Sequence, residues 1–324
     1  MNRAFRLVAA LLLLAACDRG GSREAFIESR APPGLATRYL EPEGWAWGAL
    51  QVGDDPVQRY GVASPDVVPK GQVVIVPGYG ETAEIWFETV RDLEASGLTV
   101  WVLDRAGQGG SQRFVEPRDL GHAPSFDPDR RALEALVRQI VRPTPDAPVT
   151  ILSHGDGAVV ALLALEDGLP ADGAVLSAPL VRPSGERPLS MLERLLRSDQ
   201  RPPAGWRPWR RSRPWASRAD LAADWQLANP DLRMAGPSRG WRLALQAASR
   251  AALDRAGEVR TPVLEVGAAS GSDPCERLPR CLHASVRPAS SPHLADDAAR
   301  SAWLKAVAGF ALSRSPMVDD EPLR

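Results

Sequence analysis

The sequence contains no apolar stretch long enough to cross a bilayer as a helix, which takes about 20 residues; the apolar run from Leu7 to Ala16 is too short. The formal net charge is -1, so no global charge argument for nucleic-acid binding exists. Lysine is scarce, with only Lys70 and Lys305, which we attribute to genome composition. No internal repeat or long low-complexity tract is present. The 324 residues suffice for one large α/β domain with an inserted segment, or for two small domains.

The N-terminal residues have the anatomy of a signal peptide, because a short basic region precedes the apolar run. The run ends in Leu14-Ala15-Ala16-Cys17, which resembles the lipobox of bacterial lipoproteins. That resemblance implies a signal peptide over residues 1–16 and lipidation of Cys17, which becomes the mature N-terminus. We therefore expect a lipoprotein of the bacterial cell envelope that faces the periplasm and is held to the membrane through its lipid. An ordinary signal peptide with a chance cysteine is the alternative.

Only two cysteines remain after Cys17, namely Cys275 and Cys281. An even remainder in an exported protein suggests a disulfide. The loop between them is short, so a disulfide would stabilise the fold by only about 2 kcal/mol. Two separate thiols are the alternative.

Most of the chain alternates strand and helix patterns, after a Gly-, Ser-, Arg- and Pro-rich stretch over residues 17–38 that reads as a tether. The pattern predicts strands around 58–62, 72–76, 98–103, 149–152, 173–177 and 262–266, and helices over 86–93, 129–141, 158–165 and 298–312. Strand 72–76 is continuously apolar after Gln72, as a buried parallel strand should be. Such alternation predicts an α/β fold with a mostly parallel, doubly wound sheet.

Residues 181–258 break the alternation and predict a helical cap inserted between two parts of the core, 39–180 and 259–313, with a C-terminal tail at 314–324. The cap holds half of the tryptophans and a cluster of arginines: Trp206, Trp209, Trp215, Trp225, Trp241, and Arg201, Arg207, Arg210, Arg211, Arg213, Arg218. In one interpretation the tryptophans pack the cap and the arginines solvate it. In the other, this patch faces anionic lipid headgroups.

The stretch from Thr150 to Val159 predicts a nucleophile elbow, a sharp turn from strand to helix. Such a turn needs small residues two positions before and two after its apex, because the two backbones crowd there. Ser153 and Gly157 satisfy this if Gly155 is the apex, whereas an apex at Ser153 or Asp156 would put Ile151 or His154 in a crowded position. The nucleophile position is therefore a glycine, which has no side chain.

At this point the chain resembles a known family, the bacterial lysophospholipases and monoacylglycerol-lipase-like α/β-hydrolases, which are grouped with serine aminopeptidase-type hydrolases. Their elbow is commonly Gly-His-Ser-x-Gly-Gly, and here it reads Ser153-His154-Gly155-Asp156-Gly157-Ala158. Further similar stretches occur in the same order: residues 42–48, 77–79, 104–111, 121–127, 175–179 and 236–241. The resemblance implies an α/β-hydrolase fold with a degenerate catalytic triad.

The resemblance also implies roles for individual residues. The backbone N–H groups of Tyr79 and Asp156 would form the oxyanion hole, and His293, just before the closing helix, would be the catalytic base. The triad acid should follow strand 262–266. An ungapped match places it at Gly271, and Asp273 is the nearest candidate.

The other chemistry-bearing residues predict no cofactor and no metal site. His154 is expected to be structural, His122 to form a loop hydrogen bond and His283 to lie at the surface. No spacing of His, Cys and Asp is typical of metal ligands. The glycine run at 107–110 is not followed by a helix carrying Lys-Ser or Lys-Thr, so it is not a phosphate loop.

Three functions are compatible with these residues. Loss of the nucleophile costs about 10⁶ in turnover in a serine protease, so we first expect a non-catalytic protein that binds a lipid or acyl ligand beneath its cap. The second is a weak carboxylic ester hydrolase that uses Ser153, Asp156 or a water activated by His293. The third is a protein-interaction module of the envelope. Whether the chain is an enzyme is left open.

Overall fold

The computed structural model describes residues 23–182, 185–211, 218–267, 273–287 and 290–313. The predicted signal peptide, Cys17 and the tail 314–324 lie outside these residues. No helix within the described ranges is both long and apolar enough to cross a membrane.

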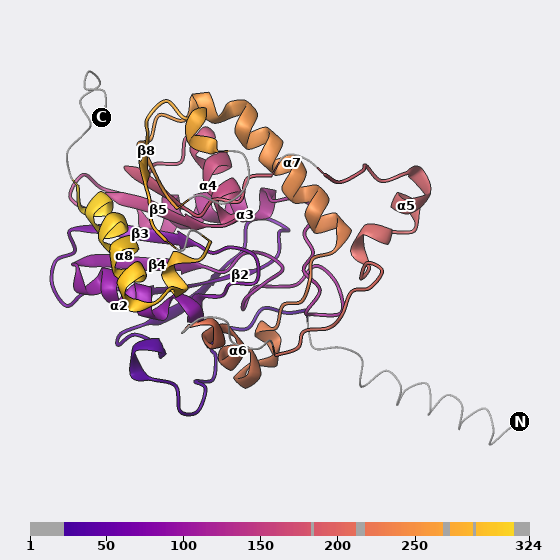
Figure 1. Ribbon diagram of the computed structural model, residues 1–324, viewed down its shortest axis with the longest axis horizontal. Coiled ribbons are helices and arrows are strands. Elements are labelled where there is room, and N and C mark those ends of the chain that lie inside the picture. The colour runs from indigo at the N-terminus through magenta and orange to yellow at the C-terminus, as the bar shows by residue number, and fades with distance from the viewer. Residues whose placement is uncertain (1–22, 183–184, 212–217, 268–272, 288–289, 314–324) are drawn as a thin grey trace, which may run out of the picture.

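An eight-stranded sheet forms the centre of the molecule (Figure 1), in the order β1-β2-β4-β3-β5-β6-β7-β8. The strands are β1 (Ala46–Leu50), β2 (Gln58–Ala63), β3 (Gly71–Val76), β4 (Leu98–Leu103), β5 (Val149–His154), β6 (Gly173–Ser177), β7 (Val263–Val266) and β8 (Cys281–Ala284). Strands β1 and β2 pair antiparallel with each other, β2 pairs antiparallel with β4, and every later pairing is parallel. This is the α/β-hydrolase arrangement that the sequence predicts.

The central strands are apolar throughout because both faces of the sheet are covered. Along β3, Val74 and Val76 join one hydrophobic core, whereas Val73 and Ile75 join the core on the opposite face. The first core contains α3 (Asp127–Ala135), α4 (Gly157–Glu166) and α7 (Arg239–Arg255). The second contains α2 (Phe87–Ala95), α6 (Ala219–Ala228) and α8 (Asp297–Leu312). Helix α4 is buried all round, so it lacks an amphipathic pattern.

Two local features depart from the sequence pattern. The helix expected over 129–141 is α-helical only to Ala135 and continues as a π-helical turn, Leu136–Val141, which ends at Arg142 with a φ of 54°. The edge strands β1 and β8 were not predicted from periodicity, because each has only four or five residues and mixed exposure. An edge strand packs on few neighbours, so its sequence carries a weak signal.

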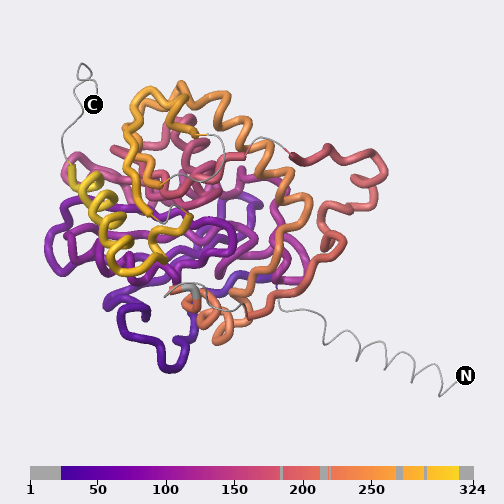
Figure 2. The backbone as a smooth tube through the Cα atoms, in the orientation of Figure 1, coloured from indigo at the N-terminus to yellow at the C-terminus, as the bar shows by residue number. Residues whose placement is uncertain are grey.

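The predicted cap segment leaves the sheet after β6 and returns to it at β7 (Figure 2). It contains α5 (Met191–Leu195), α6 and α7, together with short turns. Helix α5 projects from the body, whereas α7 lies against α4 of the core. The segment 181–258 therefore includes two helices, α6 and α7, that each contribute to a hydrophobic core, in addition to the projecting helix α5.

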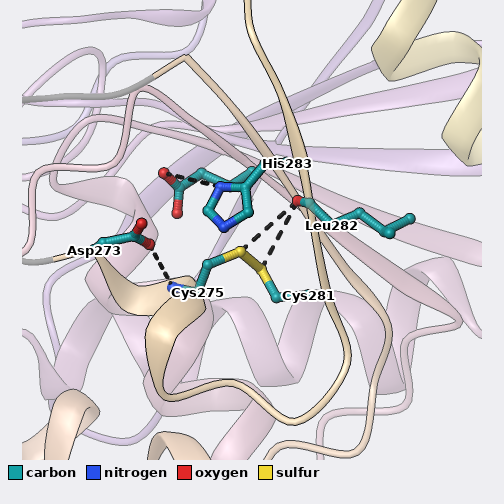
Figure 3. Close-up of a disulfide and its surroundings, with 6 residues drawn as sticks. Asp273, Cys275, Cys281, Leu282 and His283 are labelled. Carbon is teal, nitrogen blue, oxygen red and sulfur yellow. Dashed lines mark hydrogen bonds and ion pairs between the residues drawn. A yellow bond between two sulfur atoms is a disulfide. The ribbon is translucent and has the colours of Figure 1, made fainter. Parts of the chain in front are cut away.

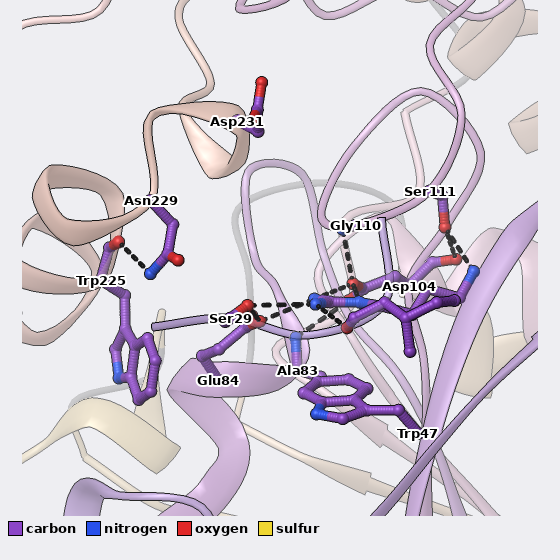
Figure 4. Close-up of polar contacts among 12 residues, drawn as sticks. Ser29, Trp47, Ala83, Glu84, Asp104, Gly110, Ser111, Trp225, Asn229 and Asp231 are labelled. Carbon is purple, nitrogen blue, oxygen red and sulfur yellow. Dashed lines mark hydrogen bonds and ion pairs between the residues drawn. The ribbon is translucent and has the colours of Figure 1, made fainter. Parts of the chain in front are cut away.

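The described part of the predicted tether is bonded to the core. Ser29 Oγ donates to Glu84, and the backbone of Arg30 exchanges two hydrogen bonds with the Asn229 side chain. The fully buried Arg59 pairs with Glu84 and Asp104, and Figure 4 shows Ser29 beside Glu84. The hydrogen bonds of Ser29 and Arg30 hold both residues against the folded domain, so this part of the predicted tether is not a free linker.

Candidate functional site

Gly155 lies at a sharp turn between β5 and α4, where the sequence predicts the nucleophile elbow. Its φ is +55°, a left-handed conformation that favours glycine. A Cβ at Gly157 would lie 2.5 Å from the carbonyl oxygen of Val76, which explains why a small residue is required two positions after the apex. A Cβ at Gly155 would meet nothing closer than Gly78 Cα, at 3.7 Å. The elbow has the expected shape and has room for a side chain that this sequence does not supply.

The backbone N–H of Tyr79, a predicted oxyanion donor, already donates to a side chain of the protein itself. The Tyr79 N–H donates to Asp156 Oδ1 at 2.6 Å, and Asp156 Oδ2 forms an ion pair with Arg105. Arg105 also pairs with Asp129, and all three of these charged side chains are almost fully buried. The Asp156 carboxylate is thus held where an oxyanion would need the Tyr79 donor. Asp156 N–H, the second predicted donor, belongs to the same residue.

His293, the predicted base, is buried beneath the elbow in a short helical turn, η8 (Pro292–Leu294). Its ring stacks on Trp86 with centroids 4.1 Å apart and an interplanar angle of 6°. Burial lowers the pKa of His293 to about 4. Its Nε2 lies 3.3 Å from Glu81 Oε1, so the nitrogen faces a carboxylate.

Glu81 also contacts His154, which precedes the elbow apex. His154 Nδ1 lies 2.7 Å from Glu81 Oε1, and His154 Nε2 lies 3.2 Å from the carbonyl oxygen of Ser290. Burial opposes charge on both partners, but their mutual attraction outweighs it: the pKa of His154 is raised and that of Glu81 is held well below its usual range. The Gly78 N–H fixes the carboxylate by donating to Glu81 Oε2 at 2.7 Å.

Asp273, the candidate acid, lies near the disulfide (Figure 3). Its Oδ1 accepts a hydrogen bond from the Cys275 N–H at 2.8 Å, and Cys275 is joined to Cys281. The Asp273 carboxylate lies within 4.8 Å of side-chain atoms of Glu265 in β7 and His283 in β8. His293 belongs to a different cluster, with Glu81 and His154. Gly271, the ungapped acid position, lies outside the described residues.

Ser153 and Asp156, the alternative nucleophiles, both have structural partners. Ser153 is fully buried, and its Oγ donates to the carbonyl oxygen of Val175. Asp156 bonds to Tyr79 and Arg105, as described above. Neither side chain is free to attack a bound acyl group.

The cap joins the core close to this site. The Tyr79 hydroxyl donates to the carbonyl oxygen of Ala235, and His122 Nδ1 lies 2.8 Å from Ser238 Oγ. His122 therefore ties the loop after β4 to the start of α7. His283 is mostly exposed on β8.

Some of the cap tryptophans and arginines pack inside the protein, and others lie at the surface, where contact with anionic lipid headgroups is the other interpretation. Trp225 and Trp241 are buried in the two cores, and Arg218 is buried against Glu88. Trp206 and Trp209 are half-buried, and the remaining described arginines of the cluster are exposed: Arg201, Arg207, Arg210 and Arg211. Trp215 and Arg213 lie outside the described residues.

Sequence reasoning missed the importance of Glu81, Arg105 and Asp129. Glu81 follows the oxyanion loop by two residues, and this position could have suggested that it belongs to the site. Arg105 and Asp129 are far apart in the sequence, and nothing in their spacing indicates that they meet.

An elbow at the carboxyl end of the central strand, an oxyanion loop after β3 and a histidine before the last helix define an α/β-hydrolase site. The chain belongs to the serine aminopeptidase S33 family, whose model matches residues 68–272. It is 29% identical to lysophospholipase L2 of Escherichia coli K12 over 209 residues, which are 59% of this chain and 61% of that protein. It is 36% identical to monoacylglycerol lipase of Mycolicibacterium smegmatis over 125 residues, 38% of this chain and 42% of that protein.

The chain thus spans less than two thirds of the length of these curated relatives. Among solved structures, a soluble variant of monoglyceride lipase from Saccharomyces cerevisiae in complex with a substrate analogue has a TM-score of 0.62. It is 15% identical and covers 88% of this chain and 99% of its own. A carboxyl esterase from Bacillus coagulans has a TM-score of 0.58 at 16% identity, and covers 83% of this chain and 98% of its own. At these identities the structural likeness concerns the fold.

Proposed function

We propose that this protein is a non-catalytic member of its family that binds a lipid or acyl ligand as a membrane-anchored lipoprotein. The observation that carries the proposal is Gly155. It has the backbone conformation of an elbow apex but no hydroxyl to attack an acyl carbonyl.

Asp156 supports the same conclusion through the oxyanion site. An oxyanion hole stabilises developing negative charge with N–H donors that are free to receive it. Here the Tyr79 N–H already donates to a buried carboxylate, which in turn is held by Arg105. An oxyanion at that donor would have to displace the carboxylate and would be repelled by it.

His293 supports it as well, because a general base must reach the proton that it removes. Its Nε2 faces Glu81 Oε1. With a pKa of about 4, caused by burial, the ring would be a weak base at neutral pH. The nucleophile, the oxyanion donor and the base are therefore all altered, as expected of a site that is no longer used for acyl transfer.

The proposed ligand class rests on the relatives and on the cap. The two curated relatives are named for lysophospholipid and monoacylglycerol substrates. Helix α5 and the residue that follows it expose several large apolar side chains: Met191, Leu192, Leu195 and Leu196. Arg23, close to the predicted anchor at Cys17, lines one surface groove together with Leu195 and Arg197. Cys17 is only six residues before Arg23, which lies beside α5, so a lipid on Cys17 would bring this side of the cap toward the bilayer.

The first test is whether the purified protein carries or binds a lipid. Lipids extracted from the protein would be identified by mass spectrometry, and a fluorescent fatty acid would be titrated into the delipidated protein. Gly155→Leu should weaken this binding because its side chain enters the space beside Gly78, whereas the matched variant Gly257→Leu, at an open position, should not. Thermal unfolding would show that both variants fold.

Saturable binding that is lost in Gly155→Leu alone would support the proposal. The absence of any extracted lipid, together with no saturable binding of the fatty acid, would contradict it.

A further inference from the structure

Three side chains from distant parts of the sequence converge beside Gly78. Glu81 lies in the loop after β3, His154 ends β5, and His293 lies in η8. Glu81 Oε1 is 2.7 Å from His154 Nδ1 and 3.3 Å from His293 Nε2. One ligand atom from each of the three residues can be chosen so that all lie within 4.8 Å of one another. The three residues are far apart in the sequence, which explains why no sequence motif predicts this cluster.

The hydrogen bond of His154 orients that ring as a ligand. A carbonyl oxygen can only accept, so the bond to Ser290 requires a proton on His154 Nε2. Nδ1 then faces the cluster at 2.7 Å from Glu81 Oε1, so it donates to that carboxylate, and a metal ion would bind at Nδ1 by displacing this proton. A backbone carbonyl bonded to the outer nitrogen is the usual support of a metal-binding histidine. The Gly78 N–H supports Glu81 in the same way through Oε2, leaving Oε1 toward the two rings.

His293 adds a second imidazole whose position is fixed. Its ring stacks on Trp86 and also packs against the His154 ring, whose centroid is 4.5 Å away. Both nitrogens of His293 are buried: Nε2 faces Glu81 Oε1 at 3.3 Å, and Nδ1 has no hydrogen-bond partner among the described residues. A cation held between Nε2 and Glu81 Oε1 would therefore bind to two groups that already face each other.

The donor set matches a known coordination chemistry. Two histidines and one glutamate form the protein ligands of several zinc sites, with metal–ligand distances of about 2.0–2.2 Å. A tetrahedral ion at such distances places its ligand atoms about 3.4 Å apart. The 3.3 Å between Glu81 Oε1 and His293 Nε2 is close to this value, whereas the 2.7 Å between Glu81 Oε1 and His154 Nδ1 would have to widen by about 0.7 Å when the ion replaces the hydrogen bond.

We infer that Glu81, His154 and His293 bind a divalent first-row transition-metal ion, with Zn²⁺ as the best match to the donor set. The inference goes beyond the proposed lipid binding and does not depend on it, because it concerns side chains that meet without any ligand. A four-coordinate ion would keep one position for water.

The test is metal binding by the purified full-length protein after dialysis against a chelator. Zn²⁺ would be titrated calorimetrically and its stoichiometry measured by elemental analysis. The visible absorption of the Co²⁺-loaded protein would report the coordination geometry. Two variants remove ligand atoms with little change in shape, Glu81→Gln and His293→Phe, and the second preserves a ring to stack on Trp86. His283→Gln is the matched control, because His283 belongs to the other cluster of potential ligands, with Glu265 and Asp273.

We expect one Zn²⁺ per chain and a four-coordinate Co²⁺ spectrum. Affinity should fall by at least about 100-fold in both ligand variants, since loss of even an outer-shell partner costs about 10- to 100-fold. It should be unchanged in His283→Gln. Three results would each overturn the inference. The first is failure of the parent to bind one equivalent of Zn²⁺, and the second is binding of Zn²⁺ by Glu81→Gln and His293→Phe as tightly as by the parent. The third is loss of Zn²⁺ binding in His283→Gln while both ligand variants keep it. Thermal unfolding of the metal-free variants would verify that they fold.

Discussion

Gly155 and Asp156 are adjacent residues at two positions that acyl transfer would require. Gly155 supplies no attacking group, and the Asp156 carboxylate engages the Tyr79 N–H that would stabilise the product of attack. Because these two features are independent, introducing a serine alone should not give ester hydrolysis.

We therefore predict that Gly155→Ser folds but does not hydrolyse esters. The side chain fits, since the nearest atom to its Cβ is 3.7 Å away. A non-glycine residue at a φ of +55° costs roughly 1–2 kcal/mol, so unfolding should occur at a slightly lower temperature. Ester hydrolysis and thermal unfolding would be measured together. Strong hydrolysis by Gly155→Ser alone would show that the Tyr79 donor and His293 are functional as they stand.

Asp156 should also matter for stability. Arg105 is buried between Asp156 and Asp129, and removing one partner of a buried ion pair costs about 3 kcal/mol. We expect Asp156→Ala to lower the free energy of unfolding by about that amount in urea. Asp224→Ala, which breaks the exposed pair with Arg211, should cost less than about 1 kcal/mol. Equal losses in the two variants would contradict the role assigned to Asp156.

Elements differ in how much of them could be predicted from the sequence. Strands β4 and β6 match their predicted ranges because each is a buried apolar run with clear ends. Strands β1 and β8 are short edges with mixed exposure, and their patterns are too weak to predict. The π-helical turn after α3 follows from tertiary packing, which periodicity does not report.

The candidate site shows the same division. The elbow could be located because the requirement for small residues around Gly155 is local. The Asp156 side chain, in contrast, reaches Tyr79 and Arg105 across loops that only the fold brings together. Likewise, no spacing in the sequence relates Glu81 to His154 and His293.

Strand β7 carries a testable pH effect. Burial, followed by the nearby Asp273, raises the pKa of Glu265 to about 8. Between about pH 4.5 and pH 8 the folded protein therefore holds a proton on Glu265 that the unfolded chain has lost. The free energy of unfolding consequently falls as pH rises through this range. Glu265→Gln cannot lose that proton. Relative to the parent, we expect it to gain about 3 kcal/mol in unfolding free energy between pH 5 and pH 8, because each pH unit between the two pKa values is worth about 1.4 kcal/mol and less near either value.

Urea unfolding at several pH values would measure this difference. The exposed Glu258→Gln should follow the parent at every pH. A constant difference between Glu265→Gln and the parent across the range would mean that Glu265 is charged in the folded protein.

At the scale of the whole molecule, the proposed orientation depends on the lipid anchor. Arg23 lies beside α5, and the predicted lipidation site, Cys17, is only six residues before it. When the full chain is produced in a bacterium that processes lipoproteins, Cys17→Ser should move it from the membrane fraction to the soluble fraction. Radiolabelled palmitate should be incorporated into the parent but not into the variant. Membrane retention of Cys17→Ser with no label in either protein would exclude the anchor.

The core and cap otherwise retain the arrangement of an α/β-hydrolase, with two hydrophobic cores, a complete sheet and buried ion pairs such as Arg59 with Asp104. The fold of the family thus surrounds an elbow whose apex is a glycine. The proposed function accounts for this combination, because it keeps binding and loses chemistry.

The measurement that tests this account most directly is hydrolysis of a lysophospholipid and a short-chain ester by the purified protein, with His293→Ala as the control. Both would be assayed in the presence of a chelator, so that no bound metal ion contributes. The account predicts no hydrolysis above that of His293→Ala. Hydrolysis by the parent that His293→Ala abolishes would contradict it, because the chain would then have recruited another nucleophile or an activated water.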